Sequence, residues 1–483
     1  PLSLLIQRVI IKMKLFYALL FNFIFLSAYS QQYETAIAKA RFLVKNHMEM
    51  TQVPGAQVAV MVDGKLVWSE AFGWCAIDDS VATEINTRFR VASVSKSMTS
   101  VALGKLVDEG AIDLDDNILQ YVPEFPSKEA VITSRHLAAS VSGIRHYNSS
   151  DPENSMVQYD HPFEATERFR DDPLEFLPGT AYGYSSYGWV LLSAAMESAA
   201  GQSFDELMNT TWEDLGMQHT SFDYSDQEVP NKSRFYSGLN DGKRVLAPAE
   251  NRSFMFAGGG YLSTAEDLTR MGTTLMEGSY LTRQTWQELT TPYILSDGEP
   301  TYYALGWETG TSRLGTPIIY HGGSMPSARS HLMLYPEHHL AMAILYNTGQ
   351  SVFFNEREAH VLAECFIDST REEQSNPFIG QWNIETTSLR NRRSKGQLQL
   401  TNENGLISGK ITFRRSRKKK TFPVCVVEAS ADSVHLVAVT PMFADFYIHR
   451  KELKGRWLHD MDVKRIGEVD DYWGERALQL TEQ

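Results

Sequence analysis

The chain has 483 residues, and 45 Lys and Arg against 59 Asp and Glu leave a formal net charge of −14. Hydrophobic residues make up 43% and charged residues 22%, which is typical of a folded globular protein and excludes general disorder. The acidic balance argues against nucleic acid as a partner, because phosphate binding needs clustered basic side chains. Three widely spaced cysteines, Cys75, Cys365 and Cys425, give neither a disulfide framework nor a CxxC metal site.

The first thirty residues have the pattern of an export signal. Basic residues without any acidic one precede the apolar run Leu15–Leu26, and small residues follow it. The run is shorter than the roughly 20 apolar residues that a spanning helix needs, so we expect no stable membrane insertion. Cleavage near Ser30 would give an exported, periplasmic or extracellular protein. Met13 is the first methionine, so residues 1–12 are interpreted as an upstream extension.

Taken in chain order, the patterns predict strands near both ends and helices between them. Asp63-Gly64 between two β-rich runs is a strong hairpin signal, because glycine accepts the positive φ of a tight turn. From Ser93 to Glu109 apolar residues recur at helical spacing. We therefore expect an α+β fold in which the two chain ends build one sheet, with helices packed on it and a helical insertion. Further predicted elements are a helix over 33–50, strands over 330–347 and a helix over 355–367.

A change in composition near residues 372–377 predicts a domain boundary. The segment 31–372 is expected to be the larger domain, and 377–483, with its short β runs, a small antiparallel barrel or sandwich. The basic run Arg414–Lys420 is interpreted as a solvated hairpin tip, because the chain is acidic and no aromatic ladder accompanies the run.

The pair Ser93 and Lys96 is the strongest candidate for chemistry, because it stands where a strand is expected to pass into a helix. Side chains three residues apart share a helix face, so Lys96 is expected beside the Ser93 hydroxyl. A lysine in a dry site can take a serine proton, since burial disfavours its charged form. The same spacing recurs at Ser416 and Lys419, where chemistry is not expected; the helix start distinguishes Ser93.

Two further motifs are candidates for the same site. Tyr184 and Ser186 stand in a turn that leads into an apolar helix, and a tyrosine can relay a proton if a cationic neighbour lowers its pKa. The alternative is that Tyr184 only fills the core, as aromatic residues often do. In His321-Gly322-Gly323-Ser324, the glycine pair can let a substrate backbone approach, and a backbone N–H can stabilise an oxyanion. The alternative is a turn with an ordinary histidine.

Together and in this order, the three motifs resemble the penicillin-recognising serine hydrolases, which include class C β-lactamases, D-Ala-D-Ala carboxypeptidases, D-aminopeptidases and esterases. Supporting stretches are PGTAYGYSSYGWVLL around Tyr184, AGGGYLSTAEDL at Ala257–Leu268 and ALGWETG before His321. HLAASVSGIRHY at His136–Tyr147 resembles the LACTB-type branch. The resemblance covers residues 33–370 and implies a three-layer α/β/α arrangement with an antiparallel sheet and a helical subdomain. The tail is similar to lipocalin-like barrels appended to this family.

The resemblance implies a role for each motif residue. Ser93 would be the nucleophile, Lys96 its proton acceptor, and Tyr184 the residue that shares the relay and protonates the leaving group. His321 would polarise the relay or meet a substrate carboxylate, and the backbone N–H groups of Ser93 and Ser324 would form the oxyanion hole. The remaining predicted substrate-binding residues are Ser186, Gly322 and Gly323.

Two departures from the family pattern shift the expected substrate. Ser186 stands where many members have Asn, and His321 replaces the lysine of efficient class C lactamases. Both favour peptide, amide or ester cleavage over β-lactam hydrolysis. We expect an exported serine hydrolase that forms an acyl-enzyme and needs no metal or other cofactor; its oligomeric state is open. The alternatives are a penicillin-binding-like sensor that acylates or binds without turnover, and a scaffold for assembly. Arg145 and His146 are expected to be structural or to line the rim.

Overall fold

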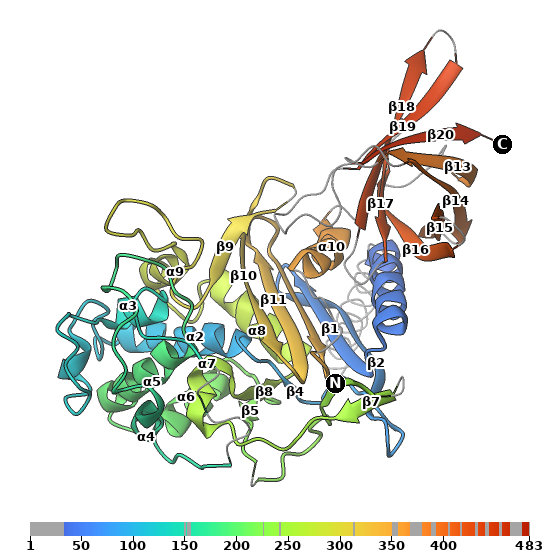
Figure 1. Ribbon diagram of the computed structural model, residues 1–483. Helices are drawn as coiled ribbons and strands as arrows, with labels where there is room; N and C mark the ends of the chain where they lie inside the picture. The colour runs from blue at the N-terminus through green and yellow to red at the C-terminus, as the bar shows by residue number, and fades with distance from the viewer. Residues whose placement is uncertain are drawn as a thin grey trace, which may run out of the picture. The chain divides into compact units, whose positions relative to one another are not determined.

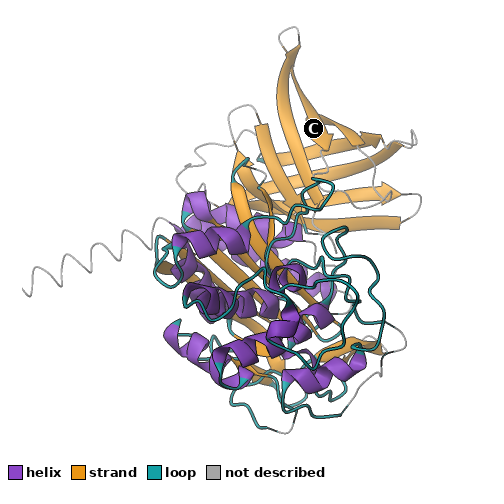
Figure 2. Cartoon of the chain, turned by 90° about the vertical axis from the view of Figure 1, so that its left-hand side faces the viewer, coloured by secondary structure: helices purple, strands orange, loops and turns teal. Residues whose placement is uncertain are grey.

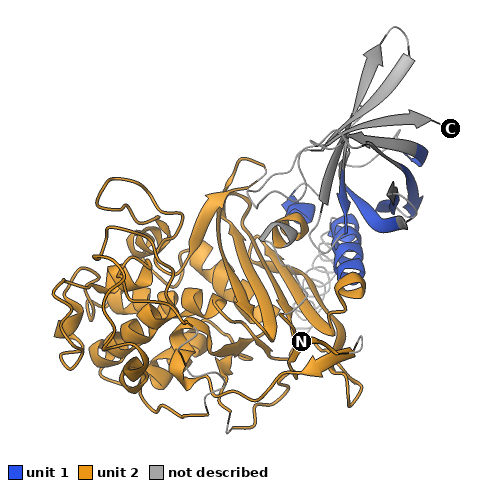
Figure 3. Cartoon of the chain, in the orientation of Figure 1, with its two compact units in different colours: residues 1–47, 364–483 blue, residues 48–363 orange. Residues whose placement is uncertain are grey.

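The computed structural model describes most of the chain, in two compact units formed by residues 48–363 and by residues 1–47 with 364–483 (Figure 3). The described residues are 33–148, 151, 156–225, 227–240, 243–312, 314–349, 356–367, 379–387, 393–403, 406–415, 418–429, 433–439, 444–453, 456–463 and 476–482. The predicted export signal lies outside them and stays a prediction. Within the described residues, every helix is too short or too polar to cross a membrane.

The larger unit is built on one antiparallel sheet to which both ends of that unit contribute (Figure 1). Its seven strands have the order β3-β2-β1-β12-β11-β10-β9. The strands are β1 Gly55–Val62, β2 Lys65–Ala76, β3 Val81–Ala82, β9 Glu308–Thr311, β10 Pro317–Met325, β11 Ala328–Tyr335 and β12 Leu340–Tyr346.

Two features of the sequence explain this sheet. The hairpin between β1 and β2 turns at Asp63 and Gly64, both of which have positive φ. Strands β1 and β12 pair antiparallel along their length, from Ala56 opposite Tyr346 to Val62 opposite Leu340, and are almost entirely buried. The prediction that segments far apart in the chain share one sheet is therefore confirmed.

Helices cover the sheet and build the predicted helical subdomain (Figures 1 and 2). Helix α8 packs against β1, β11 and β12, and α2 contacts α5, α6, α7 and α9 as well as β10 and β11. The helices of this unit are α2 Val94–Asp108, α3 Ser134–Ala138, α4 Pro162–Ala165, α5 Ser186–Ala200, α6 Phe204–Asp214, α7 Phe256–Gly259, α8 Ala265–Met276 and α9 Arg283–Thr290. The predicted N-terminal helix is found over residues 33–51 and belongs mainly to the other unit, and α10 Glu356–Ile367 crosses the boundary between the two units.

Short elements complete this unit. They are the three-stranded sheet of β4 Phe89–Arg90, β8 Tyr261–Ser263 and β5 Ser221–Phe222, the hairpin of β6 Tyr236–Asn240 and β7 Lys243–Leu246, and the 3-10 helices η1 Ile118–Gln120, η2 Thr166–Arg168, η3 Ser253–Met255 and η4 Pro336–His338. Strand β4 leads directly toward α2, which places the start of that helix beside the main sheet.

The C-terminal strands form a closed eight-stranded antiparallel barrel, which confirms the predicted all-β fold of the tail. Strands β15 and β16 pair up to Arg415 opposite Lys418, so the basic run lies at a hairpin end, as predicted. Ser416 of the second Ser-x-x-Lys lies outside the described residues. All three cysteines of the chain are buried. The barrel strands are β13 Gly380–Thr387, β14 Arg393–Glu403, β15 Leu406–Arg415, β16 Lys418–Ala429, β17 Ser433–Ala438, β18 Ala444–Leu453, β19 Arg456–Val463 and β20 Arg476–Glu482.

Candidate active site

Ser93 occupies the N-cap position of α2, but its hydroxyl makes no capping hydrogen bond. A serine at this position usually caps the helix, so this hydroxyl is free for another task. The residue before it, Ala92, has a left-handed φ of 47°, a strained conformation for a residue with a side chain. The strained turn presents a partly exposed Ser93 hydroxyl at the helix start, where backbone N–H groups lack intrahelical partners.

Lys96 lies one turn further along α2 and is completely buried. Its Nζ is 3.3 Å from Ser93 Oγ, 2.9 Å from Ser186 Oγ and 2.6 Å from the carbonyl oxygen of Gly258. The structure therefore brings Ser93 and Lys96 together, as their spacing predicts. It also adds Gly258, which sequence reasoning did not select.

Burial controls the protonation of this lysine. The pKa of Lys96 is lowered from 10.5 to about 7, because desolvation disfavours the charged amine. A substantial share of Lys96 is then neutral at neutral pH. A neutral amine has a lone pair for the Ser93 proton, so Lys96 can act as the general base.

Tyr184 lies in the turn before α5, and the Ser93 side chain lies close enough to influence its pKa. Its ring also lies beside Lys96, with Nζ 4.9 Å from the ring centroid. A lowered pKa was the condition for a relay that starts from the phenolate, and this condition is not met: burial raises the pKa of Tyr184 well above its ordinary value, and the Ser93 side chain only opposes this. Tyr184 is therefore a protonated phenol at neutral pH, suited to donate a proton rather than to take one first.

Ser186, the first residue of α5, accepts a hydrogen bond from Lys96. Its backbone N–H donates to His146 Nδ1 over 3.1 Å. The α5 N-cap, Ser185, accepts from the Gly188 N–H and donates to the carbonyl of Arg145. These contacts fix the turn that carries Tyr184 and show that Ser186 positions the lysine.

His321 on β10 is buried, and both its ring nitrogens are engaged within the protein. Nε2 lies 2.9 Å from the Tyr303 hydroxyl, and Nδ1 lies 2.7 Å from the carbonyl of Gly322. Burial, with the nearby Lys96 charge, lowers the pKa of His321 to about 3. The imidazole is thus neutral at neutral pH. This opposes a cationic role toward a substrate carboxylate, one of the two roles expected for it.

The glycines after His321 lie in different surroundings. A Cβ at Gly323 would lie 2.3 Å from the Val91 carbonyl oxygen and 2.0 Å from Ser330 Oγ. Gly323 is therefore required because β10 runs against the segment that leads to Ser93. At Gly322 a Cβ would lie 3.3 Å from the His331 ring, a tight but less severe contact. Ser324 is exposed on the same strand, opposite Arg329.

Comparison with known proteins decides the family. The sequence profile described as Beta-lactamase matches residues 40–365, more than half of the chain. The chain belongs to the beta-lactamase family. The resemblance drawn from the three motifs is thereby confirmed, and the family is one of serine β-lactamase and penicillin-binding-protein-like hydrolases.

Relatives within the beta-lactamase family share modest identity with the chain. The human protein "Serine beta-lactamase-like protein LACTB, mitochondrial" is 28% identical over 401 residues, covering 64% of this chain and 73% of that protein. The Staphylococcus aureus "Protein flp" is 24% identical over 358 residues, covering 72% of this chain and 70% of its own length. The chain thus matches most of the length of both relatives.

Solved structures confirm the fold. The octameric penicillin-binding protein homologue from Pyrococcus abyssi superposes with a TM-score of 0.61 at 20% identity, covering 92% of this chain and 99% of that one. A class C beta-lactamase superposes with a TM-score of 0.58 at 19% identity, covering 70% of this chain and 97% of that one. A D-stereospecific amidohydrolase from Streptomyces superposes with a TM-score of 0.55 at 23% identity, covering 71% of this chain and 99% of that one. The predicted β-lactamase-like α+β fold is confirmed.

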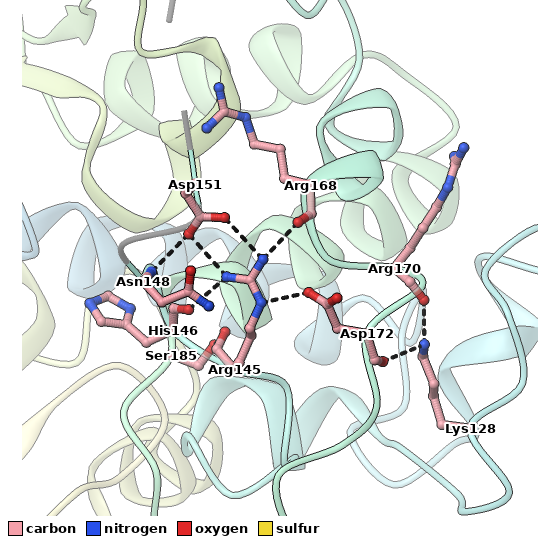
Figure 4. Close-up of polar contacts among 9 residues, drawn as sticks. All are labelled: Lys128, Arg145, His146, Asn148, Asp151, Arg168, Arg170, Asp172 and Ser185. Carbon is pink, nitrogen blue, oxygen red and sulfur yellow. Dashed lines mark hydrogen bonds and ion pairs between the residues drawn. The ribbon is translucent and has the colours of Figure 1, made fainter. Parts of the chain in front are cut away.

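Arg145 lies at the centre of a network of hydrogen bonds and ion pairs, which Figure 4 shows. All five of its N–H groups have acceptors: Asp172, both oxygens of Asp151, and the carbonyls of His146 and Arg168. This network fixes the loop that presents His146 and agrees with the expected structural role of Arg145.

His146 itself lies closer to the chemistry than the sequence indicated. Its ring lies 5.5 Å from that of Tyr184 in an edge arrangement, besides its bond to Ser186. Burial, with the nearby Lys96 charge, lowers the pKa of His146 to about 4. The signal that could have found it is the stretch SGIRHY, which the family resemblance already contained.

Proposed function

We propose that the protein cleaves a peptide, amide or ester through an acyl-enzyme on Ser93. The observation that carries this proposal is the contact of 3.3 Å between Ser93 Oγ and the buried amine of Lys96, whose pKa of about 7 suits a base at neutral pH. The unused capping capacity of Ser93 and the influence of its side chain on the pKa of Tyr184 support the same assignment.

The acylation step follows from these contacts. Neutral Lys96 takes the Ser93 proton as Oγ attacks the substrate carbonyl carbon, and the negative charge develops on the carbonyl oxygen. The backbone N–H groups of Ser93 and Ser324 are proposed to stabilise this oxyanion. When the tetrahedral intermediate collapses, the bond to the leaving group breaks. The leaving group takes a proton from the Tyr184 hydroxyl, which regains one from charged Lys96.

Deacylation reverses the roles. A water molecule gives a proton to neutral Lys96, directly or through Tyr184, and its oxygen attacks the acyl carbon. The ester bond to Ser93 Oγ breaks, Oγ regains the proton, and the acid product leaves. The D-stereospecific amidohydrolase among the structural neighbours supports an amide as one of the substrate classes.

Covalent labelling tests the proposal. A small fluorophosphonate and a fluorescent penicillin are each incubated with the full chain and with Ser93→Ala, and a panel of p-nitrophenyl esters, D-amino amides, D-Ala-D-Ala peptides and nitrocefin is assayed for turnover. Ser193→Ala is the matched control, because its hydroxyl bonds only the carbonyl of Val190 within α5. We expect labelling and turnover to disappear in Ser93→Ala and to persist in the control.

The same experiment separates hydrolysis from the sensor alternative. One equivalent of product, released in a burst and followed by no steady rate, would favour a protein that acylates without turnover. Labelling that persists in Ser93→Ala would overturn the nucleophile assignment.

A further inference from the structure

Four tyrosines, called here the aromatic strip, connect the catalytic phenol with the protein surface. The rings of Tyr184 and Tyr303 lie 5.9 Å apart in an edge arrangement, and that of Tyr303 lies 5.9 Å from Tyr182. The rings of Tyr182 and Tyr302 lie 5.1 Å apart. Tyr303 is completely buried, whereas Tyr302 is 54% exposed. The half-buried Tyr182 and the exposed Tyr302 therefore offer the aromatic surface of the strip, and the buried Tyr303 connects them with Tyr184 from below.

The histidine beside the strip has no hydrogen-bonding position left for an incoming anion. Tyr303 occupies His321 Nε2, and the Gly322 carbonyl occupies Nδ1. A neutral ring with Nδ1–H donating to the carbonyl accepts from the tyrosine at Nε2. Tyr303 thus both belongs to the strip and closes the imidazole to a substrate carboxylate.

The carboxylate of Glu308 places a negative charge beside His321. Glu308 Oε1 lies 3.8 Å from His321 Nδ1. After burial, which is the larger cause, the Glu308 charge also raises the pKa of Tyr184 and of Tyr303. A second carboxylate brought to this region would meet like charge in a partly dry environment, which is unfavourable.

We propose that the leaving-group side of the site binds an uncharged aromatic group along the aromatic strip, and not a terminal carboxylate. This inference rests on the proposed function, because Tyr184, as proton donor to the leaving group, defines which side that is. Aromatic rings prefer edge and offset contacts at the separations that this strip already uses. The substrate class is an ester or amide whose departing alcohol or amine carries an aryl group, or a peptide that continues with an aromatic residue.

The reaction adds no step to the one proposed. The acyl–oxygen or acyl–nitrogen bond breaks, the aryl-bearing alcohol or amine takes the Tyr184 proton, and the acyl group stays on Ser93. The strip changes only how well the departing group is held while the bond breaks.

Substrates with a constant acyl group test the inference on the full chain. Benzyl, cyclohexylmethyl and ethyl esters of one N-acetylated amino acid compare an aromatic ring with a saturated ring of similar size. A peptide ending in phenylalaninamide is compared with the same peptide ending in free phenylalanine. We expect kcat/KM to be about three- to ten-fold higher for the benzyl than for the cyclohexylmethyl ester. The amide is expected to exceed the free acid by about ten-fold or more.

Variants then assign the preference to the strip. In Tyr302→Ala the benzyl to cyclohexylmethyl ratio is expected to fall toward one, whereas Tyr302→Phe, which keeps the ring, retains it. Ile294→Ala is the matched control, because Ile294 is equally exposed at 54% but stands outside the strip. A wild-type ratio near one, a free acid cleaved as fast as the amide, or a ratio unchanged in Tyr302→Ala would each overturn the inference. Fluorophosphonate labelling of wild-type Ser93 shows separately whether the proposed function stands.

Discussion

Lys96 Nζ lies 2.6 Å from the carbonyl oxygen of Gly258. A carbonyl can only accept, so one N–H of the lysine points to it whether the amine is charged or neutral. The other contacts, to the hydroxyls of Ser93 and Ser186, can be donated or accepted. The lysine can therefore lose and regain a proton without leaving its place.

The pH dependence of acylation is expected to report Lys96. Because its pKa is about 7 and the neutral form is the base, the rate rises with pH through about 7 and levels off above it. His146, with a pKa of about 4, is already neutral there. The measurement is the second-order rate of fluorophosphonate labelling between pH 5.5 and 9. In His146→Gln the midpoint should stay near 7; a midpoint that moves with this variant would contradict the assignment.

Tyr184→Phe removes the proposed proton donor and keeps the ring. We expect kcat to fall by about 10²-fold or more, because positioned proton transfer contributes that much, with a smaller effect on KM. Steady-state kinetics with an amide substrate give both constants. The matched control is Tyr187→Phe, a tyrosine three residues away whose ring stacks on Phe169 in the core. Equal losses in the two variants would indicate a structural effect rather than a proton relay.

Arg145→Ala should destabilise the fold and reduce activity together. Arg145 and Asp151 are both 12% exposed, and loss of one partner leaves a largely buried carboxylate unpaired. The expected cost is about 3 kcal/mol in the free energy of unfolding, measured by denaturant titration. Arg135→Ala is the control, because its partners Asp115 and Glu288 are 65% and 31% exposed, and exposed pairs contribute about 1 kcal/mol or less. A smaller loss in Arg145→Ala than in Arg135→Ala would contradict the structural role of the network.

Buried histidines are expected to make the fold sensitive to acid. Burial lowers the pKa of His331 from 6.5 to about 3. The unfolded chain therefore binds a proton more readily below pH 6.5, and the stability present above that pH is lost as pH falls toward about 3. At pH 5 the loss is about 2 kcal/mol for this residue. His331→Gln should weaken the fall in unfolding free energy between pH 7 and 5, whereas a variant of the exposed His339 should not. Identical slopes in wild type and His331→Gln would show that the residue does not titrate as described.

Gly323→Ala should impair the site more than Gly322→Ala. The new methyl would collide with the Val91 carbonyl and with Ser330, so β10 or the segment before Ser93 must shift. We expect at least about ten-fold loss in labelling rate, in line with the cost of a small misplacement of catalytic groups. At Gly322 the methyl meets only the edge of the His331 ring. Comparable losses for the two alanines would contradict the close packing inferred for Gly323.

Local spacing predicted the central part of the site well. Two residues three apart at a helix start had to share a face, so Ser93 and Lys96 met as expected. The hairpin at Asp63-Gly64 and the pairing of distant strands also followed from turn chemistry and burial patterns. The order of the three motifs indicated the family through its resemblance to known hydrolases, whereas physical chemistry alone would not have identified it.

Contacts between distant segments could not be read from any pattern. The Gly258 carbonyl contacts Lys96, and the Tyr303 hydroxyl contacts His321. Both contacts form only because tertiary packing brings segments that are distant in the sequence together. The direction of the Tyr184 pKa shift could not be read from the sequence for the same reason: burial, which raises this pKa, is a property of the packed site. Sequence supplies the reactive groups, while their protonation states depend on what surrounds them.

The two largest β systems of this chain, the seven-stranded sheet and the barrel, limit strand addition in different ways. The outermost strands of the seven-stranded sheet are β3, with two residues, and β9, with four, so each offers little unpaired backbone to a foreign strand. The closed barrel leaves no strand without a neighbour on both sides. Short or absent edges protect against fibril-like self-association. Deleting the last barrel strand, β20, would open that ring and expose β13 and β19 as long templates for aggregation.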